Sequence, residues 1–221
     1  MPVSQSRPSI DPPKKPQKRN AEETRERLLN AATLEFCERG YDGARIERIA
    51  KNACCNIRMA YHYFDDKEGL YLAVLERVYS ELRQKEKDLD LEHLDPASGM
   101  RRLIEFTFDH MGAHPEFVSL VLNENLLSGR MLRKSSKVVH ETTPLVGMIK
   151  NTLGRGEKAG VFRHAVDSMQ LYVSILSLSF VHISNRYTLS IIFEKDLGDP
   201  QWLRERRVHA VDVIMSYLAR D

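Results

Sequence analysis

The sequence predicts an all-α protein, and three observations favour that fold class. Apolar residues recur at helical spacing along most of the chain, as Leu28, Ala32 and Phe36 do near its start. No segment alternates apolar and polar residues as a half-buried strand would, and no internal repeat is found. Glycine and proline fall mostly between the periodic segments or near their ends, where they break helices. We therefore expect helices joined by short connections.

The periodicity and its breaks predict where each helix lies. The first is expected to start at Asn20, because Asn20 and Glu23 resemble a capping box, and to end at Gly40. Two short helices follow, then a long amphipathic one with a start signal at Asp65–Asp66. Pro144 lies inside a later segment and should kink or split it. The helices after the first are expected at residues 44–53, 57–64, 67–88, 96–112, 115–128, 136–159, 167–193 and 200–219.

Length and composition exclude several classes of protein. The chain has 221 residues, of which 42% are hydrophobic and 29% charged. This suits a globular protein of one large or two small domains, and not a collagen-like or wholly disordered chain. The formal net charge is only +2, so any binding to nucleic acid must come from a local basic patch.

Residues 1–19 differ in composition from the rest of the chain. They contain five prolines, five basic residues and one acid. Such a segment cannot bury enough apolar surface to fold, so we expect a disordered basic tail. The alternative is an arm that touches DNA phosphates or a minor groove.

Cysteine usage and targeting signals predict a cytoplasmic location. Cys37, Cys54 and Cys55 are too few, and odd in number, for a disulfide framework, which indicates reduced thiols. The N-terminal stretch lacks the apolar core of a signal peptide. The most apolar run, residues 171–183, is shorter than the roughly 18 residues that a membrane span requires. No membrane partner is therefore expected.

Residues 44–64 have the pattern of a helix-turn-helix, because two short helices joined by a tight turn follow a longer helix. In that unit the second helix enters the major groove of DNA and the first crosses the backbone. The second helix is "NIRMAYHYF", in which Ala60 and Phe64 are expected to face the core. The residues expected to point outward are Arg58, Met59, His62 and Tyr63, with Tyr61 at the margin.

These outward side chains suit DNA recognition. Arg58 can pair with guanine through two hydrogen bonds, and Met59 can touch a thymine methyl group. Tyr61 and Tyr63 offer hydroxyls to phosphates, and Lys67 adds positive charge.

The segment "RERLLNAATLEFCERGYDGARIERIAKNACCNIRMAYHYFDDKEGLYLAVL" closely resembles the N-terminal domain of TetR-family transcriptional regulators. The resemblance covers roughly residues 22–75 and rests on "F-x-x-x-G-Y", "I-x-x-I-A" and "Y-H-Y-F-x-x-K-E-x-L". It implies a homodimer in which each chain has a DNA-binding head, residues 20–66, and a helical effector-binding and dimerisation body, residues 67–221. It also implies binding to a double-stranded, palindromic operator.

Several residues depart from the family pattern near the turn. Cys54 and Cys55 stand where the family usually has a Gly-Val-Ser-like sequence, followed by Asn56 as the helix cap. Arg45 lies near a position where the family often has Thr, and can contact phosphate by a charge-assisted hydrogen bond. Ile57 fits either the core or the groove. The DNA-binding candidates are therefore Arg45, Asn56, Ile57, Arg58, Met59, Tyr61, His62, Tyr63 and Lys67.

Three interpretations of the cysteine pair remain open. The residues can simply fill a tight turn, since buried cysteine behaves as a small hydrophobe. Cys54 can instead act as a thiol switch if it is exposed near the positive end of the third helix. A metal site would need further ligands, and none lies near in sequence, so we predict no metal.

The body is expected to hold both the effector and the dimer interface. The resemblance implies that the last two helices, here within residues 171–193 and 202–218, pack against those of a second copy. An effector site needs a few polar groups in an apolar cavity. The ligand-binding candidates on this basis are Phe108, Met111, Glu124, Asn125, His140, His182 and Asn185.

The effector itself is only loosely indicated. The segments "PEFVSLVLNENLLSG" and "FVHISNRYTLSIIFEKDL" are similar to the subgroup that includes the regulator of pyrimidine utilisation. That similarity implies a polar heterocycle or a related catabolite. His110 and His114 have the spacing of metal ligands on a helix, but Gly112 and Pro115 predict a solvated helix end there instead.

The leading hypothesis is a ligand-responsive repressor. No nucleophile motif, phosphate loop or paired-carboxylate arrangement stands out, so no enzyme and no cofactor is predicted. The alternatives are a thiol-sensing regulator that uses Cys54 and Cys55, and a DNA binder that answers to no effector.

Overall fold

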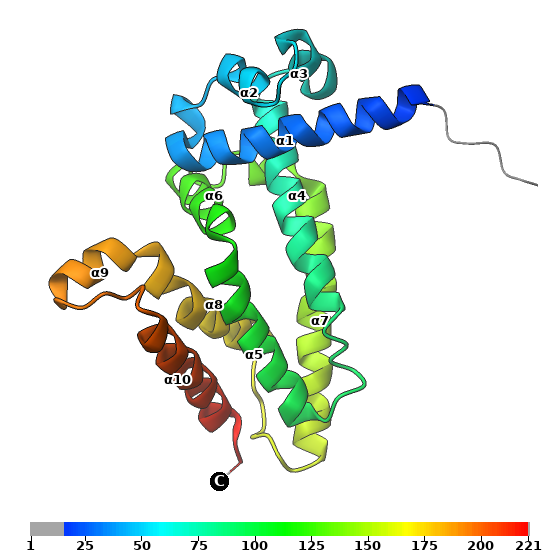
Figure 1. Ribbon diagram of the computed structural model, residues 1–221. Helices are drawn as coiled ribbons and strands as arrows, with labels where there is room; N and C mark the ends of the chain where they lie inside the picture. Colours follow the sequence, from blue (N-terminus) through cyan, green and yellow to red (C-terminus); the bar gives the residue numbers. More distant parts are fainter. Residues whose placement is uncertain (1–15, 221) are drawn as a thin grey trace, which may run out of the picture.

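The computed structural model describes residues 16–220, with side chains from residue 20 onward (Figure 1). Within that part of the chain no strand forms, and Phe162 and Ala219 make an isolated antiparallel bridge. The predicted all-α class is therefore confirmed. The helices are α1 (Pro16–Gly43), α2 (Ile46–Asn52), α3 (Ile57–Phe64), α4 (Lys67–Lys87), α5 (Pro96–Ala113), α6 (Pro115–Leu126), the 3₁₀ turn η1 (Leu132–Lys134), α7 (Ser136–Lys158), α8 (Ser168–Ser184), α9 (Arg186–Ile192) and α10 (Pro200–Leu218).

The start of the first helix differs from the prediction. α1 begins at Pro16, so the predicted start at Asn20 is wrong. The carbonyl of Asn20 accepts a hydrogen bond of 2.8 Å from the hydroxyl of Thr24, as a residue inside a helix does. The rest of the predicted tail, residues 1–15, lies outside the described residues. Regular helix ends at Gly40 as predicted, because its φ of 65° is open to glycine and unfavourable for other residues.

Short polar side chains set the starts of most helices. Asn56 accepts a hydrogen bond from the N–H of Arg58 at the start of α3, and Asp66 accepts one from Gly69 at the start of α4. The same role is taken in α5, α7, α8 and α10 by Asp95, Ser135, Asp167 and Asp199. These caps satisfy N–H groups that the first helical turn leaves unpaired, so the observed starts lie close to the predicted ones.

The prediction of one helix over residues 167–193 is wrong. α8 ends at Ser184 and α9 begins at Arg186, with Asn185 between them at φ −110° and ψ 17°. The side-chain amide of Asn185 donates hydrogen bonds to the Val181 carbonyl and to the Ser184 hydroxyl. Such local bonds compete with helical ones, which explains a break that apolar periodicity does not reveal.

α7 continues through Pro144 and is not split there. Pro144 lies on the exposed side of the helix, where water can replace the backbone hydrogen bond that its ring removes. On the opposite side Leu145 and Ile149 are buried and hold the helix against the body.

The head rests on two helices of the body. α1, α2 and α3 pack on one another at one end of the molecule, α4 leads from the head into the body beside α7, and α6 lies against α1 (Figure 1). One hydrophobic cluster is shared by the head, α4 and α6, and a second fills the body between α5, α7, α8 and α10. Phe106 and Leu176 border both clusters, so the two cores are continuous.

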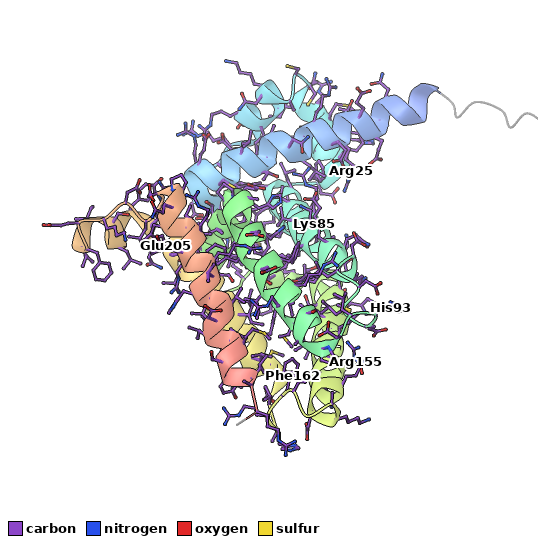
Figure 2. All side chains as sticks on the ribbon, turned by 60° about the horizontal axis from the view of Figure 1, so that its bottom comes forward. Arg25, Lys85, His93, Arg155, Phe162 and Glu205 are labelled. Atoms are coloured by element: carbon purple, nitrogen blue, oxygen red, sulfur yellow. The ribbon has the colours of Figure 1, made fainter. Side chains whose placement is uncertain are left out.

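The far end of the body is closed by two contacts of α7 (Figure 2). Arg155 donates hydrogen bonds of 2.7 and 2.8 Å to the carbonyls of Leu91 and Leu94, which fixes the connection between α4 and α5. Phe162 packs directly on Gly156, where a Cβ atom would overlap its ring. Among the described helices, none combines the length and the apolar character needed to cross a membrane.

Candidate nucleic-acid interface and effector cavity

α2 and α3 form the helix-turn-helix that the sequence predicts. Ile49 of α2 and Ala60 and Phe64 of α3 are buried against the rest of the head, as expected from their spacing. In the turn between the helices, Cys54 has a φ of 52°, the left-handed conformation that favours glycine. Asn56, a predicted DNA contact, caps α3 through its side chain and remains exposed to solvent.

The exposed face of α3 differs in part from the predicted one. Arg58 and His62 are exposed as predicted, and Tyr61, expected at the margin, is exposed as well, at 44%. Met59 and Tyr63 were expected to point outward, but both are half-buried against the head core. The Tyr63 ring packs against neighbouring aromatic rings of α3, a contact that helical phase alone does not indicate. Ile57 also packs partly against the core.

Arg45 precedes α2, and Lys67 is the first residue of α4. Arg45 stands at the N-cap position of α2 with its side chain exposed and making no capping hydrogen bond, and its backbone N–H donates to the Glu35 carboxylate at 3.1 Å. The Lys67 ammonium lies 4.8 Å from the centre of the Tyr41 ring and 3.3 Å from the Asp42 carbonyl. The position of Lys67 is thus fixed by the end of α1.

The sequence did not reveal the ion pair that fixes the start of α2. Arg48 donates to the buried carboxylate of Glu35 at 2.7 Å. Burial opposes ionisation of Glu35, but Arg48 and the Arg45 N–H outweigh it and hold the pKa of this carboxyl below its ordinary value. The sequence carried a partial signal for this buried carboxylate, because Glu35 directly precedes Phe36 in a stretch whose apolar spacing predicts burial.

The cysteines lie in different surroundings. Cys54 is exposed and Cys55 is half-buried against the head core, where burial raises the pKa of its thiol. Cys37 donates a hydrogen bond to the Glu116 carbonyl, and burial raises the pKa of its thiol to about 12. Among the described residues no group of histidine, cysteine and acidic side chains could hold a metal ion.

The predicted solvated end at His110 and His114 is only half right. His114 is partly exposed and bonds to Glu116 and Lys85. His110 is 6% exposed and packs against Phe117, so the prediction that its side chain is solvated is wrong. Burial, with the nearby charges of His114 and Lys85, lowers the pKa of His110 to about 4.

The structure does not bring the predicted effector residues together in one place. Phe108 and His182 line a cavity between α5, the α8–α9 junction and α10, whereas Met111 lines a separate one. Glu124 is 2% exposed and accepts hydrogen bonds from the N–H groups of Met131 and Leu132, so it holds the loop before α7. The remaining predicted effector residues have exposed side chains: Asn125, His140 and Asn185.

The cavity that Met111 lines measures about 290 Å³ and opens between α4, α5, α6 and α8. Its lining is largely apolar, with Phe117 and Val121 from α6, and Arg83 of α4 supplies charge. The buried Nε of Arg83 has no hydrogen-bond partner among the described residues. A polar group inside an apolar cavity is the usual composition of a small-molecule site.

Arg83 belongs to a buried network that sequence analysis missed. It pairs with Glu86 at 2.8 Å and donates to the Tyr172 hydroxyl at 3.2 Å, and that hydroxyl donates to Glu86 at 3.0 Å. Burial raises the pKa of Glu86 to about 7, although Arg83 and Tyr172 oppose the shift. Glu86 follows Leu82 and Val78 at intervals of four, a spacing that could have placed it on the buried face.

Comparison with known proteins agrees with both halves of this arrangement. Residues 28–74 match the family model described as bacterial regulatory proteins of the tetR family. Residues 96–214 match the model of the tetracyclin repressor-like C-terminal domain.

Individual relatives point the same way. The HTH-type transcriptional repressor NicS of Pseudomonas putida is 38% identical over 181 residues, which are 82% of this chain and 85% of that protein. The HTH-type transcriptional repressor SCO4008 of Streptomyces coelicolor is 28% identical over 73% of this chain and 79% of its own. The crystal structure of the transcriptional regulator SCO4942 of Streptomyces coelicolor superposes with a TM-score of 0.65 and 25% identity, covering 90% of this chain and 99% of that one.

Proposed function

The chain belongs to the TetR family of bacterial transcriptional regulators, and from that premise we propose that it is an effector-responsive repressor. Two copies would bind a palindromic operator in the cytoplasm and leave it when a small molecule binds the body. The observation that carries the proposal is the exposed face of α3, with Arg58, Tyr61 and His62, on a helix-turn-helix that matches the family model.

Each part of this face suits a different part of DNA. Arg58 is free of ion pairs to other described residues, so its guanidinium can reach guanine in the major groove. Tyr61 and Arg45 are exposed as well and suit contacts to phosphate. Asn56 supports them indirectly, because it caps α3 and so fixes the start of the recognition helix.

A homodimer is supported by apolar side chains that a single chain leaves exposed. Val173 and Val181 on α8 and Val213 and Tyr217 on α10 are each more than two-fifths exposed. Large exposed apolar surfaces on a soluble protein mark interaction sites. α9 contains no buried residue and carries further exposed apolar side chains: Tyr187, Ile191 and Ile192.

For the effector we favour the cavity between α4, α5, α6 and α8, because two of its walls touch the head. α4 is the helix that leads out of the head, and Arg83 lies on it. α6 is joined to α1 by a hydrogen bond of 3.1 Å from the Asn123 side chain to the Phe36 carbonyl. A ligand that separates α4 from α6 would therefore change the position of the head.

An effector screen tests this proposal. Purified protein is heated with a panel of small metabolites and its melting temperature is followed, since a ligand at 100 times its Kd adds about 2.7 kcal/mol to the stability of the folded state. Hits are then tested for release of operator DNA by fluorescence anisotropy.

Two variants on α6 make the screen specific to the cavity. Val121→Trp would fill the cavity and abolish the response, whereas Leu122→Trp, on the exposed side of the same helix, would retain it. Binding of operator DNA that no hit reverses, or a hit that Val121→Trp leaves unchanged, would contradict the proposed effector site.

A further inference from the structure

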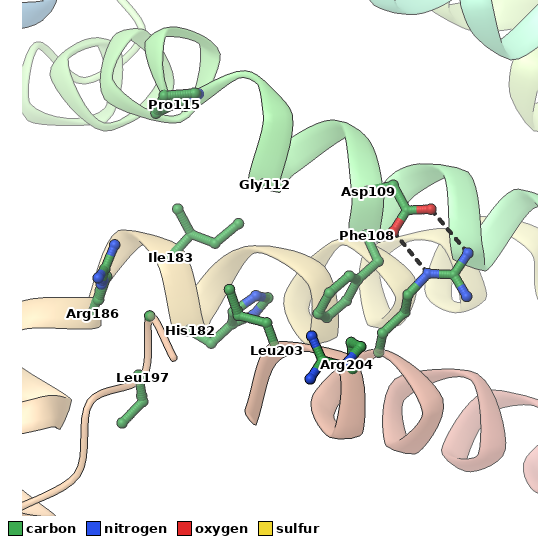
Figure 3. A pocket seen from close by; sticks show the side chains of 12 residues that line it. Phe108, Asp109, Gly112, Pro115, His182, Ile183, Arg186, Leu197, Leu203 and Arg204 are labelled. Carbon is green, nitrogen blue, oxygen red and sulfur yellow. Dashed lines mark hydrogen bonds and ion pairs between the residues drawn. The ribbon is translucent and has the colours of Figure 1, made fainter. Parts of the chain in front are cut away.

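The cavity between α5, the α8–α9 junction and α10 has the composition of a second ligand site (Figure 3). It measures about 470 Å³, within the roughly 300–1,000 Å³ that small-molecule sites occupy. Its walls are formed by the apolar side chains of Phe108, Ile183, Leu197 and Leu203. It shares no lining residue with the cavity between α4, α5, α6 and α8, so the two are separate sites.

A buried imidazole without a partner lies in the wall of this cavity. His182 is 4% exposed, and neither of its ring nitrogens forms a hydrogen bond with a described residue. Its ring stacks on Phe108 with the centres 4.7 Å apart. Burial and the nearby Arg206 lower the pKa of His182 to about 4, although the Leu178 carbonyl opposes the shift, so the ring is neutral at pH 7. A neutral, unpartnered imidazole is costly in a protein interior, and a polar group on a ligand would relieve that cost.

Positive charge at the cavity is in excess. Of its three arginines, Arg207 is held by Asp109 through two hydrogen bonds of 2.7 and 2.9 Å. Asp109 is also the only acidic residue in the lining, and Arg207 already neutralises its charge. Arg186 has a contact of 3.5 Å with Asp196, at the outer limit of a hydrogen bond. Arg204 makes no ion pair with a described residue.

We propose that this cavity binds a small organic carboxylate. The apolar body of the ligand would lie against Phe108 and Leu203, and its carboxylate would pair with Arg204. Guanidinium groups bind carboxylates through two parallel hydrogen bonds, which selects this head group over a neutral amide. The ligand would connect α10 to α5, and the site is independent of the effector site proposed above.

The chain carries its own reporter for this site. Trp202 is the only tryptophan in the sequence, and its ring lies 5.9 Å from that of His182. Occupation of the cavity should therefore change tryptophan fluorescence. We would titrate the protein with benzoate, cyclohexanecarboxylate and octanoate, and with the neutral amide of each. At least one carboxylate should give a saturable change, and its amide should bind at least tenfold more weakly, as expected for a charged hydrogen bond.

Two variants locate the site, each with a matched control. Gly112 lines the cavity, and a Cβ atom built on it meets open space, so Gly112→Leu should plug the cavity without disturbing the fold. Gly154→Leu makes the same change on α7, also into open space, and should leave binding intact. Arg204→Ala should weaken carboxylate binding roughly tenfold or more, whereas Arg101→Ala, at an exposed position early in α5, should not.

Calorimetric titration of the same variants confirms that fluorescence reports binding, and melting temperatures confirm that each variant is folded. No saturable binding of any carboxylate, equal binding of an acid and its amide, or unchanged binding in folded Gly112→Leu would overturn the proposal. Retained operator binding in all four variants would leave the proposed regulatory function unaffected, so the two ideas are tested separately.

Discussion

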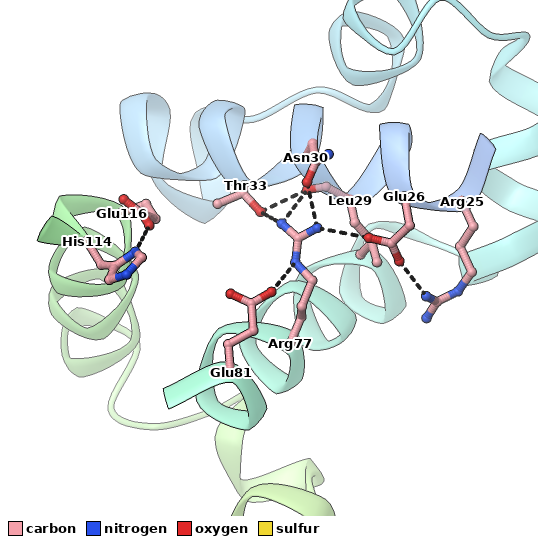
Figure 4. A network of polar contacts seen from close by, with 9 residues as sticks. All are labelled: Arg25, Glu26, Leu29, Asn30, Thr33, Arg77, Glu81, His114 and Glu116. Carbon is pink, nitrogen blue, oxygen red and sulfur yellow. Dashed lines mark hydrogen bonds and ion pairs between the residues drawn. The ribbon is translucent and has the colours of Figure 1, made fainter. Parts of the chain in front are cut away.

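Arg77 on α4 donates a hydrogen bond of 2.7 Å to the hydroxyl of Thr33 on α1 (Figure 4). The same guanidinium donates to the side chain of Asn30 at 2.8 Å and lies 3.6 Å from the carboxylate of Glu26. It also donates to the Leu29 carbonyl at 3.4 Å, so one side chain of the connecting helix contacts four residues of α1 over two of its turns. Because α4 also lines the proposed effector cavity, Arg77 is one polar link through which movement of α4 would reach the head.

We expect Arg77→Met to weaken this link without removing the apolar stem of the side chain. Thr33 would keep its own bond to the Leu29 carbonyl, so the loss is confined to the charged hydrogen bonds of Arg77. Because the group is partly exposed, the free energy of unfolding should fall by about 1–2 kcal/mol, measured by urea denaturation. Operator affinity should fall as well, since the head would be less well positioned. Arg101→Met, at an exposed site on α5, is the control and should change neither quantity.

Substitutions of the two exposed arginines of the helix-turn-helix, Arg58 and Arg45, should change DNA binding in different ways. Arg58→Ala should cost about 1–3 kcal/mol of operator binding and relax the preference at one base pair, because it would remove the proposed contact to a base edge. Arg45→Ala should weaken binding to all sequences alike and reduce the salt dependence by about one charge, because it would remove the proposed phosphate contact. Anisotropy titrations against operator and unrelated DNA at several salt concentrations measure both effects. Identical behaviour of the two variants would show that the roles are wrongly assigned.

The helices were predictable because their signals are local. Asp66, Asp95, Asp167 and Asp199 each stand before a periodic segment, and each caps a helix. The predicted capping box at Asn20 failed because four preceding residues, 16–19, extend the helix.

The sites were less predictable because their contacts join distant parts of the chain. The exposed positions of α3 follow from its helical periodicity. The exceptions are Met59 and Tyr63, which pack against the head core. The buried partner of Arg83, by contrast, is Tyr172, and no local pattern relates residues 89 positions apart. Periodicity likewise placed Phe108 and Met111 on apolar faces, but it did not show that they line different cavities.

Cys54→Gly should stabilise the head. Cys54 has a φ of 52°, and the left-handed conformation costs a residue with a Cβ atom roughly 1 kcal/mol. Glycine removes that strain but is more flexible when unfolded, so we expect a net gain of a few tenths of a kcal/mol to about 1 kcal/mol by thermal denaturation. Cys55→Gly is the contrasting variant and should destabilise, because it removes a side chain packed on the head core.

The same variant tests the thiol-switch alternative. Cys54 is exposed, so an oxidant that acts through it should release operator DNA from the original protein and not from Cys54→Gly. Equal sensitivity of the two proteins to peroxide would exclude a sensing role for Cys54.

The burial of Glu86 should give the body a measurable pH dependence. Its folded-state pKa is raised to about 7 from an ordinary value of 4.5. Between these values the folded protein keeps the proton and the unfolded chain has lost it, so this group destabilises the fold progressively as pH rises from about 4.5 to 7. Glu86→Gln keeps a neutral hydrogen-bonding side chain and should lack that slope.

The difference in unfolding free energy between Glu86→Gln and the original protein is the quantity to follow. His110 and His182 have pKa values lowered to about 4, so they act in the opposite direction, raising stability as pH rises towards 6.5. Their contribution is common to both proteins and cancels in the difference. Between pH 4.5 and 7 the unfolding free energy of Glu86→Gln should rise by about 1–3 kcal/mol relative to that of the original protein.

Glu92→Gln is the control. Glu92 is an exposed acid beyond the end of α4, so its substitution should show no such trend. A flat difference for Glu86→Gln would mean that Arg83 and Tyr172 keep Glu86 ionised throughout this range.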